Sequence, residues 1–437
     1  MQRYRASDVT RDNPVRLPCN KWLGRDVDVV AGTAEDQGPE DRGATTGYDM
    51  TDRSTGYAFV IGDRNLAVPL HAAGASVVIV GPRSNPARFS RFVHSFVEDP
   101  RSDEDARVAA LLARAAELKG PAALFYQFDG GLLFVSRRRD ELAKGLRFVV
   151  PSAELVESLV DKAAFQQLAS NLDLPVPPST IIDVSDAHGV IERLSYPVLV
   201  KPLRREASWR TFSKGKAELV DRQEDMATLL QAFGGRNDRL IAQTLIPGPE
   251  TRIESYHVHV ASSGEIAVEF TGRKLRTHPA SMGHSTALVT TDAADVADLG
   301  RSIIHKLGLR GVAKLDFKRD LDGRLWLLEV NPRFNLWHHV GAAAGADILG
   351  SVWAELLGLP RPPVTRARPG VTWCRLEHDI VAAHQQGMKL ARWSRWAVSS
   401  DTKSTVDFAD PLPWLMGSAL KPLYRRRLGA TTTTAAG

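Results

Sequence analysis

Two acidic side chains in the second half of the chain are spaced to act together. Glu329 interrupts the apolar run WLLEV, and Asp316 lies in the strand-like stretch GVAKLDFKRD. A carboxylate inside an apolar strand is costly unless a positive group meets it. Between the two stretches lies the dipeptide Asp322-Gly323, which is typical of a two-residue β-hairpin turn. A turn at this dipeptide predicts that Asp316 lies directly opposite Glu329.

The same turn places Lys314 opposite Asn331. Because side chains alternate along a strand, four polar residues would share one face of the hairpin: Lys314, Asp316, Glu329 and Asn331. Two carboxylates and an amide oxygen, completed by phosphate oxygens, are ligands that suit magnesium. The alternative is a solvated sheet face on which Lys314 and Arg333 neutralise the acids. The apolar neighbours of Glu329 favour the metal site.

Two lysines could bind the phosphates that such a metal attracts. Lys201 ends the apolar strand YPVLVKP, where a solvated lysine is unusual. Lys162 begins a helix, where its ammonium opposes the positive end of the helix dipole unless an anion binds there. Each of these lysines alone is also consistent with an ordinary surface position.

The bulk composition is that of an ordinary globular protein. The 437 residues are 43% hydrophobic and 24% charged, with a net charge of +5, which suits about two or three domains. The basic excess is too small to indicate nucleic-acid binding, whereas nucleotides fit it. Two distant cysteines, Cys19 and Cys374, argue against a disulfide scaffold. Since no apolar run is long enough to span a bilayer and no signal peptide is visible, we predict a cytoplasmic protein.

The elements that position these residues begin as an alternation of strands and helices. From Tyr57 to about residue 151, apolar strands flank helical stretches, which predicts a parallel sheet; the strands are YAFVIG, SVVIVG, AALFYQF and LRFVVP. The first strand continues as IGDRN, without the Gly-x-Gly-x-x-Gly fingerprint of a dinucleotide site. Further on, YHVHV and EIAVEF, separated by ASSGE, predict antiparallel strands. We therefore expect a fold that mixes α/β and α+β parts.

Four parts are expected along the chain. Residues 1–52 are polar and lack periodicity, which predicts a disordered tail. Met50 is an alternative start of the protein, and a regulatory tail is the competing interpretation. Residues 53–150 form the β/α domain, residues 151–360 carry the acidic hairpin and both lysines, and residues 361–437 form a C-terminal extension with a disordered end.

Together these motifs resemble the ATP-grasp superfamily of carboxylate–amine ligases over roughly residues 56–360. DKAAFQQLASNLDLPVPPST resembles the family's Asp-Lys helix with its Pro-x-Pro segment, and YPVLVKP resembles the strand with the second ATP lysine. IAQTLIPGPE resembles the hinge that holds adenine, while KLDF and LLEVNPRF resemble the two metal-binding strands. The resemblance implies a pre-ATP-grasp domain at 53–150 and a two-subdomain ATP-grasp fold with antiparallel sheets at 151–360.

The resemblance assigns residues to ATP and to the metal ion. It implies that Lys162 and Lys201 bind the phosphates, that Gln243 and Leu245 line the adenine pocket, and that Glu250 approaches the ribose. It further implies that Mg²⁺, or Mn²⁺ as an alternative, is bound by Asp316, Glu329 and Asn331.

The resemblance also implies which cations act on the reacting groups. Arg333 would stabilise the transferring phosphoryl group or the tetrahedral intermediate, and Lys314 stands where related ligases carry a basic residue. In GRKLRTHPASMGHST, the cations at the acyl phosphate or an anionic substrate would be Arg273, Lys274 and Arg276; a solvated basic run is the alternative. Many relatives cover the triphosphate with a Gly/Ser-rich loop, whereas the equivalent stretch here, RREASWRTFSKGKAEL, has one glycine and the candidate Lys216.

Within the superfamily, the layout is most similar to predicted carboligases related to D-aspartate ligase, because of FYQFDGG, the GRKLR segment and FADPLPW. This resemblance implies that ATP phosphorylates a small-molecule carboxylate and that an amine attacks the acyl phosphate, with release of ADP and phosphate. A carboxylase-type reaction and a non-catalytic nucleotide-binding scaffold are the alternatives. No nucleic-acid partner is expected, and a homodimer is an open alternative.

Four histidines and the C-terminal end have competing interpretations. His257 and His259 in YHVHV could form a metal pair, but we expect them on one exposed strand face. His338 and His339 could border an acceptor pocket or lie at the surface where a helix begins. The segment PLPWLMGSALKPLYRRRLG mixes apolar and basic side chains, which suits an anionic membrane surface; a helix packed on the body of the protein is the preferred interpretation.

Overall fold

The computed structural model describes most of the chain between residues 56 and 420. The described ranges are 56–203, 209, 217–232, 239–280, 282–363, 366–404 and 407–420. The predicted N-terminal tail with its alternative start at Met50, the candidate Lys216 and the basic end of the chain after residue 420 lie outside these ranges.

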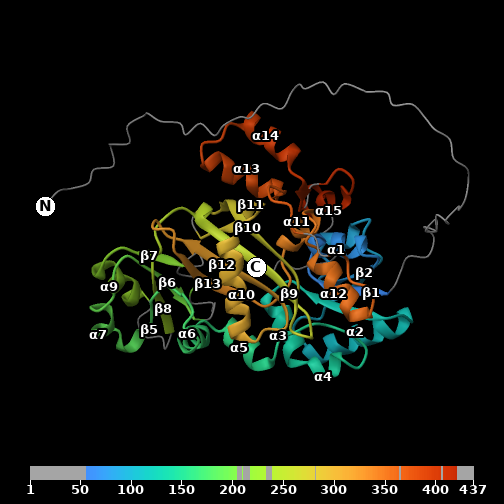
Figure 1. The fold of residues 1–437 in the computed structure, drawn as a ribbon, viewed down its shortest axis with the longest axis horizontal. Coiled ribbons are helices and arrows are strands. Elements are labelled where there is room, and N and C mark those ends of the chain that lie inside the picture. Colours follow the sequence, from blue (N-terminus) through green and yellow to red (C-terminus); the bar gives the residue numbers. More distant parts are fainter. Residues whose placement is uncertain are drawn as a thin grey trace, which may run out of the picture. The chain divides into compact units, whose positions relative to one another are not determined.

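The described N-terminal residues form a parallel sheet of apolar strands, as predicted. The strand order is β3-β2-β1-β4 (Figure 1), with β1 (Tyr57–Ile61), β2 (Ser76–Gly81), β3 (Ser95–Glu98) and β4 (Ala122–Tyr126). Its helices are α1 (Arg64–Ala72), α2 (Glu104–Leu118), α3 (Asp129–Arg137) and α4 (Arg139–Leu142). The predicted strand LRFVVP is wrong, because this segment contributes only one bridge, between Arg147 and Ala123.

A second, antiparallel sheet carries the two lysine-bearing elements. Its order is β5-β8-β6-β7, with β5 (Ser179–Asp183), β6 (Val198–Pro202), β7 (Glu218–Val220) and β8 (Arg239–Thr244). Helices α7 (His188–Ile191) and α9 (Gln223–Ala232) pack together beside it, and the helices before it are α5 (Ala153–Val160) and α6 (Lys162–Asn171). Alternate residues of β6, among them Val198 and Val200, are buried in the core of this sheet.

The largest sheet carries the acidic hairpin. Its order is β13-β12-β9-β10-β11-β14-β15, with β9 (Ile253–Val260), β10 (Ile266–His278), β11 (His284–Thr291), β12 (Gly311–Arg319), β13 (Leu325–Asn331), β14 (Thr372–Cys374) and β15 (Thr402–Lys403). The C-terminal extension thus adds β14 and β15 to this sheet. It also contains α13 (Leu376–Gln385), α14 (Leu390–Ser399) and the short α15 (Leu412–Trp414).

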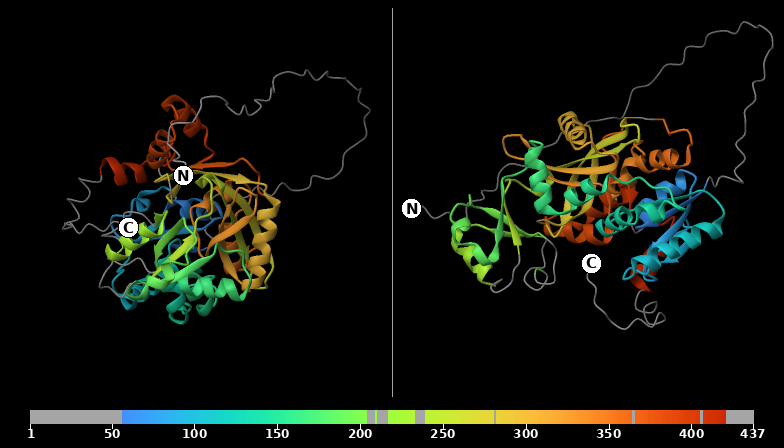
Figure 2. Two further views of the ribbon diagram at one scale, coloured as in Figure 1. Left: turned by 90° about the vertical axis from the view of Figure 1, so that its left-hand side faces the viewer. Right: turned by 90° about the horizontal axis from the view of Figure 1, so that it is seen from below.

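The seven-stranded sheet lies between the other two in Figure 1 and in the right-hand view of Figure 2. On one face, α10 (Ala294–Leu307) shares a core with Tyr256 and Leu315. On the other, α11 (Trp337–Ala343) and α12 (Ile348–Leu357) join the sheet to the strands of the parallel sheet in one continuous core. No single helix in the described ranges is long and apolar enough to cross a bilayer; α11 and α12 meet that test only as a pair bent by 91°.

The loop of the β12–β13 hairpin differs from the predicted two-residue turn. Residues 321–323 form the loop, which is closed by a hydrogen bond from Asp320 N to Arg324 O of 2.9 Å. Gly323 has a positive φ of 88°. Three-residue hairpin loops end in such a left-handed residue, which glycine adopts without a steric penalty.

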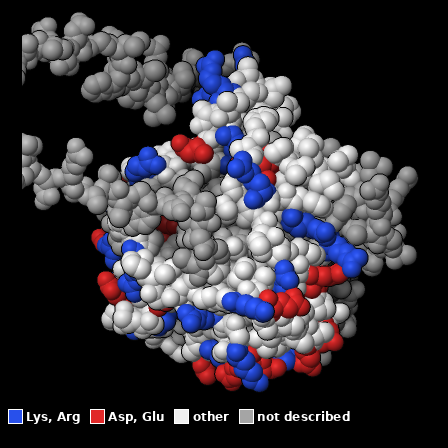
Figure 3. Space-filling model, turned by 90° about the vertical axis from the view of Figure 1, so that its right-hand side faces the viewer, with Lys and Arg blue, Asp and Glu red and all other residues white. Residues whose placement is uncertain are grey.

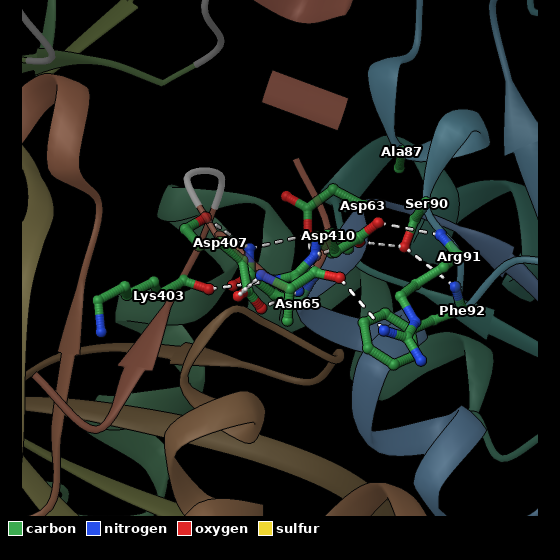
Figure 4. Close-up of polar contacts among 12 residues, drawn as sticks. Asp63, Asn65, Ala87, Ser90, Arg91, Phe92, Lys403, Asp407 and Asp410 are labelled. Carbon is green, nitrogen blue, oxygen red and sulfur yellow. Dashed lines mark hydrogen bonds and ion pairs between the residues drawn. The ribbon is translucent and has the colours of Figure 1, made fainter. Parts of the chain in front are cut away.

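The C-terminal segment returns to the parallel sheet and packs against the start of α1 and the residues that follow η1 (Pro86–Phe89) (Figure 4). Arg64 is 4% exposed, its Nε donates to Asp410 Oδ2 at 2.8 Å, and its Nη2 pairs with Asp407. Ser90 Oγ and the backbone N–H of Arg91 also donate to Asp410. If either Arg64 or Asp410 were removed, the other would stay as a buried charge without a partner and without water. Both side chains are therefore needed to hold this segment in place. The FADPLPW motif therefore has a structural role in the fold.

Candidate active site

The predicted pairing across the acidic hairpin is confirmed. In the ladder of β12 and β13, Asp316 lies opposite Glu329 and Lys314 lies opposite Asn331. The longer loop would have shifted this register, but the ladder passes over Leu328 between the tip and these pairs. Such a bulge inserts one extra residue into one strand and so restores the pairing.

Asp316 is the buried carboxylate of the pair. It is 3% exposed, Lys314 Nζ donates to its Oδ2 at 2.6 Å, and Ser255 Oγ donates to its Oδ1. Burial by itself raises the pKa of Asp316, but Lys314, Lys274 and these two hydrogen bonds lower it overall. The side chain is therefore an ionised carboxylate held by cations on the same face of the sheet.

Glu329 is placed differently from the prediction. Its side chain is exposed, because β13 is an edge strand of the large sheet and only alternate residues, such as Leu327 and Val330 on either side of the bulge, reach the core. Asn331 Nδ2 donates to Glu329 Oε1 at 3.0 Å. The argument that an enclosed Glu329 demands a metal ion is therefore wrong, and its position opposite Asp316 is what remains in favour of one.

The donors at the hairpin fit magnesium in type. Asp316 and Glu329 offer two facing carboxylates, and Asn331 offers an amide oxygen next to them. Lys314 and Ser255 engage both oxygens of Asp316, so a metal ion would have to share or replace these contacts. No group of three or more His, Cys, Asp and Glu side chains suited to hold a metal ion occurs among the described residues.

The two predicted phosphate lysines lie at the ends of their elements. Asp161 caps α6 by accepting from the backbone N–H groups of Ala163 and Ala164 at 2.9 and 3.0 Å. Lys162, the first residue of α6, donates to Leu203 O at 3.0 Å. Lys201 in β6 is half-buried.

Charges from three separate elements act on Lys201. Burial lowers its pKa, Glu329 raises it, Lys162 lowers it, and Glu250 raises it. Lys201 Nζ also donates to Gln243 Oε1 of β8 at 2.9 Å. Four residues selected separately in the sequence thus act on one ammonium group.

A cavity of about 400 Å³ lies beside these charges, within the size range of small-molecule sites. Its lining includes two of the predicted nucleotide residues, Leu245 and Glu250, and the cations Lys274 and Lys318. The C-terminal extension also reaches it through Gln386, which follows α13. Apolar side chains line it as well, among them Leu199, Leu219, Leu275 and Met282.

Arg333 connects the acidic hairpin to the parallel sheet. Its Nη1 donates to Gln127 O at 3.0 Å, its Nη2 donates to Asn331 Oδ1 at 3.2 Å, and its Nε pairs with Asp129. Asp129 is the first residue of α3, directly after β4. Asp129 is the aspartate of the motif FYQFDGG. The sequence showed that this motif resembles relatives, but it did not indicate that its aspartate pairs with Arg333.

The loops after β1 and β4 meet beside Arg333. Asp63 N donates to Gln127 Oε1 at 2.8 Å, and Gln127 Nε2 donates to Asp63 Oδ2 at 3.0 Å. In the order β3-β2-β1-β4 the chain leaves β1 to one side and returns on the other. Open α/β sheets bind ligands at the carboxyl ends of strands where the order reverses in this way. A substrate crevice here would adjoin Arg333.

Comparison with known proteins gives related ligases. The family model for the D-Ala–D-Ala ligase C-terminus matches residues 168–335, which include the hairpin and Lys201. A D-aspartate ligase of Enterococcus faecium is 23% identical over 57% of this chain and 62% of that protein. A D-alanine–D-alanine ligase of Acinetobacter baylyi is 24% identical over 44% of this chain and 62% of that protein. The chain thus matches about three fifths of the length of these relatives. These matches show that the chain is similar to ATP-grasp carboxylate–amine ligases over the residues that carry the hairpin and Lys201.

Solved structures support the ATP-grasp fold over most of the chain. An L-amino acid ligase from Bacillus licheniformis has a TM-score of 0.55 at 17% identity and covers 74% of this chain and 79% of its own. A biotin carboxylase from Campylobacter jejuni has a TM-score of 0.57 at 16% identity over 72% and 74%. At these identities the likeness concerns the fold alone.

The basic segment GRKLR is divided between the two faces of β10. Arg273 pairs with Glu254, which lies opposite Phe317, so it projects from the face that α10 covers, away from Asp316. The prediction that Arg273 faces the reacting groups is therefore wrong. The face of the sheet on which a side chain of β10 lies is decided by strand alternation and by the bulges in this strand. The bulges were not visible in the sequence.

The other two cations of this segment, Lys274 and Arg276, make different contacts. Lys274 acts on Asp316 and lines the cavity, and its role at an acyl phosphate or anionic substrate stays a prediction. Arg276 is 6% exposed, and its Nε and Nη2 donate to the two oxygens of Asp379 at 2.8 and 2.7 Å. Although Arg276 also lines the cavity, this pair commits its guanidinium to α13, so its predicted role at an acyl phosphate is not supported.

The four histidines that the sequence singled out are core residues. His257 and His259 are fully buried, so the predicted exposed face is wrong. They lie on the face of β9 that meets α11 and α12: His257 stacks on Phe270 with centroids 4.4 Å apart, and His259 Nδ1 lies 2.9 Å from Ser351 Oγ. His338 and His339 are buried too, which contradicts a surface position for them.

Proposed function

We propose that this chain is an ATP-dependent ligase that joins a small-molecule carboxylate to an amine through an acyl phosphate. The observation that carries the proposal is the convergence on Lys201 of charges from α6, η3 (Glu250–Arg252) and β13, beside a cavity of nucleotide size. Its sequence relatives named above are ligases of amino acids, which favours an amino acid or a peptide as the substrate.

In this proposal the lysines bind and orient the triphosphate. Lys162 and Lys201 hold the phosphates, Gln243 orients Lys201, and Leu245 and Glu250 border the adenosine. Asp316, Glu329 and Asn331 hold a magnesium ion, which would neutralise the charge that develops on the phosphates. Lys274 and Lys314 add positive charge on the same face of the sheet.

The reaction then balances as two displacements. A carboxylate oxygen attacks the γ-phosphorus, the bond to the β–γ bridging oxygen breaks, and ADP leaves. The amine attacks the acyl carbon, loses a proton, and phosphate leaves with its bonding electron pair. Arg333, which joins the hairpin to the residues after β4, is placed to stabilise the negative charge of both displacements.

The test is a screen for ADP release and hydroxamate formation. Amino acids and short peptides are supplied with Mg-ATP, with hydroxylamine replacing the amine. We expect one acid to give both ADP and a hydroxamate, and Glu329→Gln to abolish both. AMP as the main product would contradict the acyl phosphate. ATP binding without any turnover across the screen would favour a nucleotide-binding scaffold.

Surface charge gives no reason to prefer a nucleic-acid partner. On the face shown in Figure 3, Lys and Arg side chains lie among Asp and Glu side chains rather than in one continuous band. The cytoplasmic location and the homodimer stay predictions.

A further inference from the structure

The cavity contains a buried lysine that the sequence motifs did not select. Lys318 of β12 is 8% exposed and lines the cavity. It lies two residues after Asp316, so both side chains leave β12 on the same face. Within the described ranges, no residue forms a hydrogen bond or an ion pair with its ammonium group.

A molecule in the cavity would meet the ammonium group of Lys318. The residue is largely buried and lines the cavity, so such a molecule must offer this group an acceptor in place of the water that it displaces. The charged groups that face it come from two other elements: burial lowers the pKa of Lys318, Glu250 of η3 raises it, and Lys274 of β10 lowers it. A molecule that fills the cavity removes the remaining water from Lys318 and Glu250 together, so it must offer polar atoms to both.

Lys318 and Glu250 require opposite hydrogen-bonding partners on a bound molecule. The ammonium of Lys318 only donates, whereas the carboxylate oxygens of Glu250 accept. A hydroxyl group can do both, and two neighbouring hydroxyls can meet a donor on one side and an acceptor on the other. The apolar side chains Leu199, Leu245 and Met282 line the same cavity and suit a flat base.

We propose that Lys318 and Glu250 together bind the ribose diol of the nucleotide. Lys318 donates to the oxygen of one hydroxyl, and Glu250 accepts from the other hydroxyl. This inference rests on the proposed nucleotide-dependent function and adds a second ribose ligand to it. Lys274 borders the same cavity but acts on Asp316 as well, which places it toward the phosphates and makes it the matched control.

The test compares nucleotides that lack single hydroxyls. The dissociation constants of ADP, 2′-deoxy-ADP and 3′-deoxy-ADP are measured by calorimetry with Mg²⁺ for the full-length protein and for K318M, E250Q and K274M. A hydrogen bond to a charged group changes affinity by about ten- to a hundredfold. The unaltered protein should therefore bind ADP more tightly than the deoxy analogue that lacks the hydroxyl facing Lys318.

The variants decide whether Lys318 is responsible. K318M should weaken ADP binding and lose the preference over that one analogue, while E250Q loses the preference over the other. K274M should weaken all three nucleotides by the same factor and keep both preferences. Because K318M removes a buried charge, it should melt at the same or a higher temperature without nucleotide, which shows that weaker binding does not come from unfolding.

The possible failures are distinguishable. If the unaltered protein binds none of the three nucleotides, both the proposed function and this inference are wrong. If it binds ADP and both deoxy analogues equally, or if K318M weakens all three equally, the diol contact is wrong while the nucleotide site stands.

Discussion

Replacing Asp379 by alanine should open the C-terminal extension and destabilise that part of the protein strongly. Asp379 is fully buried and accepts hydrogen bonds from Arg276 Nε and Nη2, Thr286 Oγ1 and Trp393 Nε1, at distances of 2.7 to 3.0 Å. The variant would leave the guanidinium of Arg276 buried without an anion. Breaking a buried pair in this way costs about 3–5 kcal/mol.

A single cysteine offers a local probe for this change. Cys374 of β14 is fully buried, its Sγ lies 3.6 Å from Asp379 Oδ2, and burial raises the pKa of its thiol. In a Cys19→Ser background it is the remaining thiol of the chain. A loss of about 3 kcal/mol or more corresponds to at least about a hundredfold increase in the open population, so Cys374 should react with a thiol reagent about a hundredfold faster in Asp379→Ala.

Two controls define the refutation. Replacing both partners, with Arg276→Met and Asp379→Leu, should restore much of the protection, since no buried charge then lacks a partner. The exposed pair Arg222–Asp225 has side chains that are 71% and 46% exposed, and Asp225→Ala should change the rate little. A labelling rate in Asp379→Ala that equals the rate in Asp225→Ala would refute the account of this ion pair.

The other predictions concern the hairpin, the substrate crevice and pH. Glu329→Gln should change the free energy of unfolding by less than about 0.5 kcal/mol, because the side chain is exposed, yet reduce ADP release at least about a hundredfold; unfolding with normal activity per folded molecule would contradict the metal role. Asp129→Asn should free Arg333 from its ion pair and raise kcat for ADP release, because the guanidinium is then shared with no carboxylate; an unchanged kcat would argue against Arg333 as the group that stabilises the transferring phosphoryl. Burial lowers the pKa of His338 to about 3 and of His339 to about 4, whereas the unfolded chain binds these protons near pH 6.5. The free energy of unfolding should therefore fall as pH drops from about 6.5 toward 4, by up to about 1.4 kcal/mol per pH unit for each histidine; His339→Leu should flatten this slope in denaturant titrations, and an identical slope would count against the buried neutral state.

The acidic hairpin shows what local sequence patterns could predict. The pairing of Asp316 with Glu329 followed from the position of a turn, and the structure has it. The turn itself was assigned one residue too short, and a bulge at Leu328 compensates for that difference. Strand alternation also placed Lys318 on the face of Asp316, so it could have been selected from the sequence, but no motif drew attention to it.

The remaining site residues depend on contacts between distant segments. Arg333 and Asp129 are 204 positions apart, and Arg64 and Asp410 are 346 positions apart. No periodicity in a single sequence indicates which distant charge meets which. Burial was misjudged because it also depends on which distant elements cover a strand. Glu329 lies in an apolar run but is exposed at a sheet edge. His257 and His259 are polar but are covered by α11 and α12.

The central claim is that a carboxylate oxygen attacks the γ-phosphorus of ATP. The most direct measurement uses the acid identified by the hydroxamate screen, labelled with ¹⁸O in its carboxylate, with Mg-ATP and the amine. Mass spectrometry of the products should show one labelled oxygen in the released phosphate, ADP as the nucleotide product, and one labelled oxygen retained in the amide. Labelled AMP with unlabelled pyrophosphate, or phosphate without any label, would contradict the acyl-phosphate mechanism.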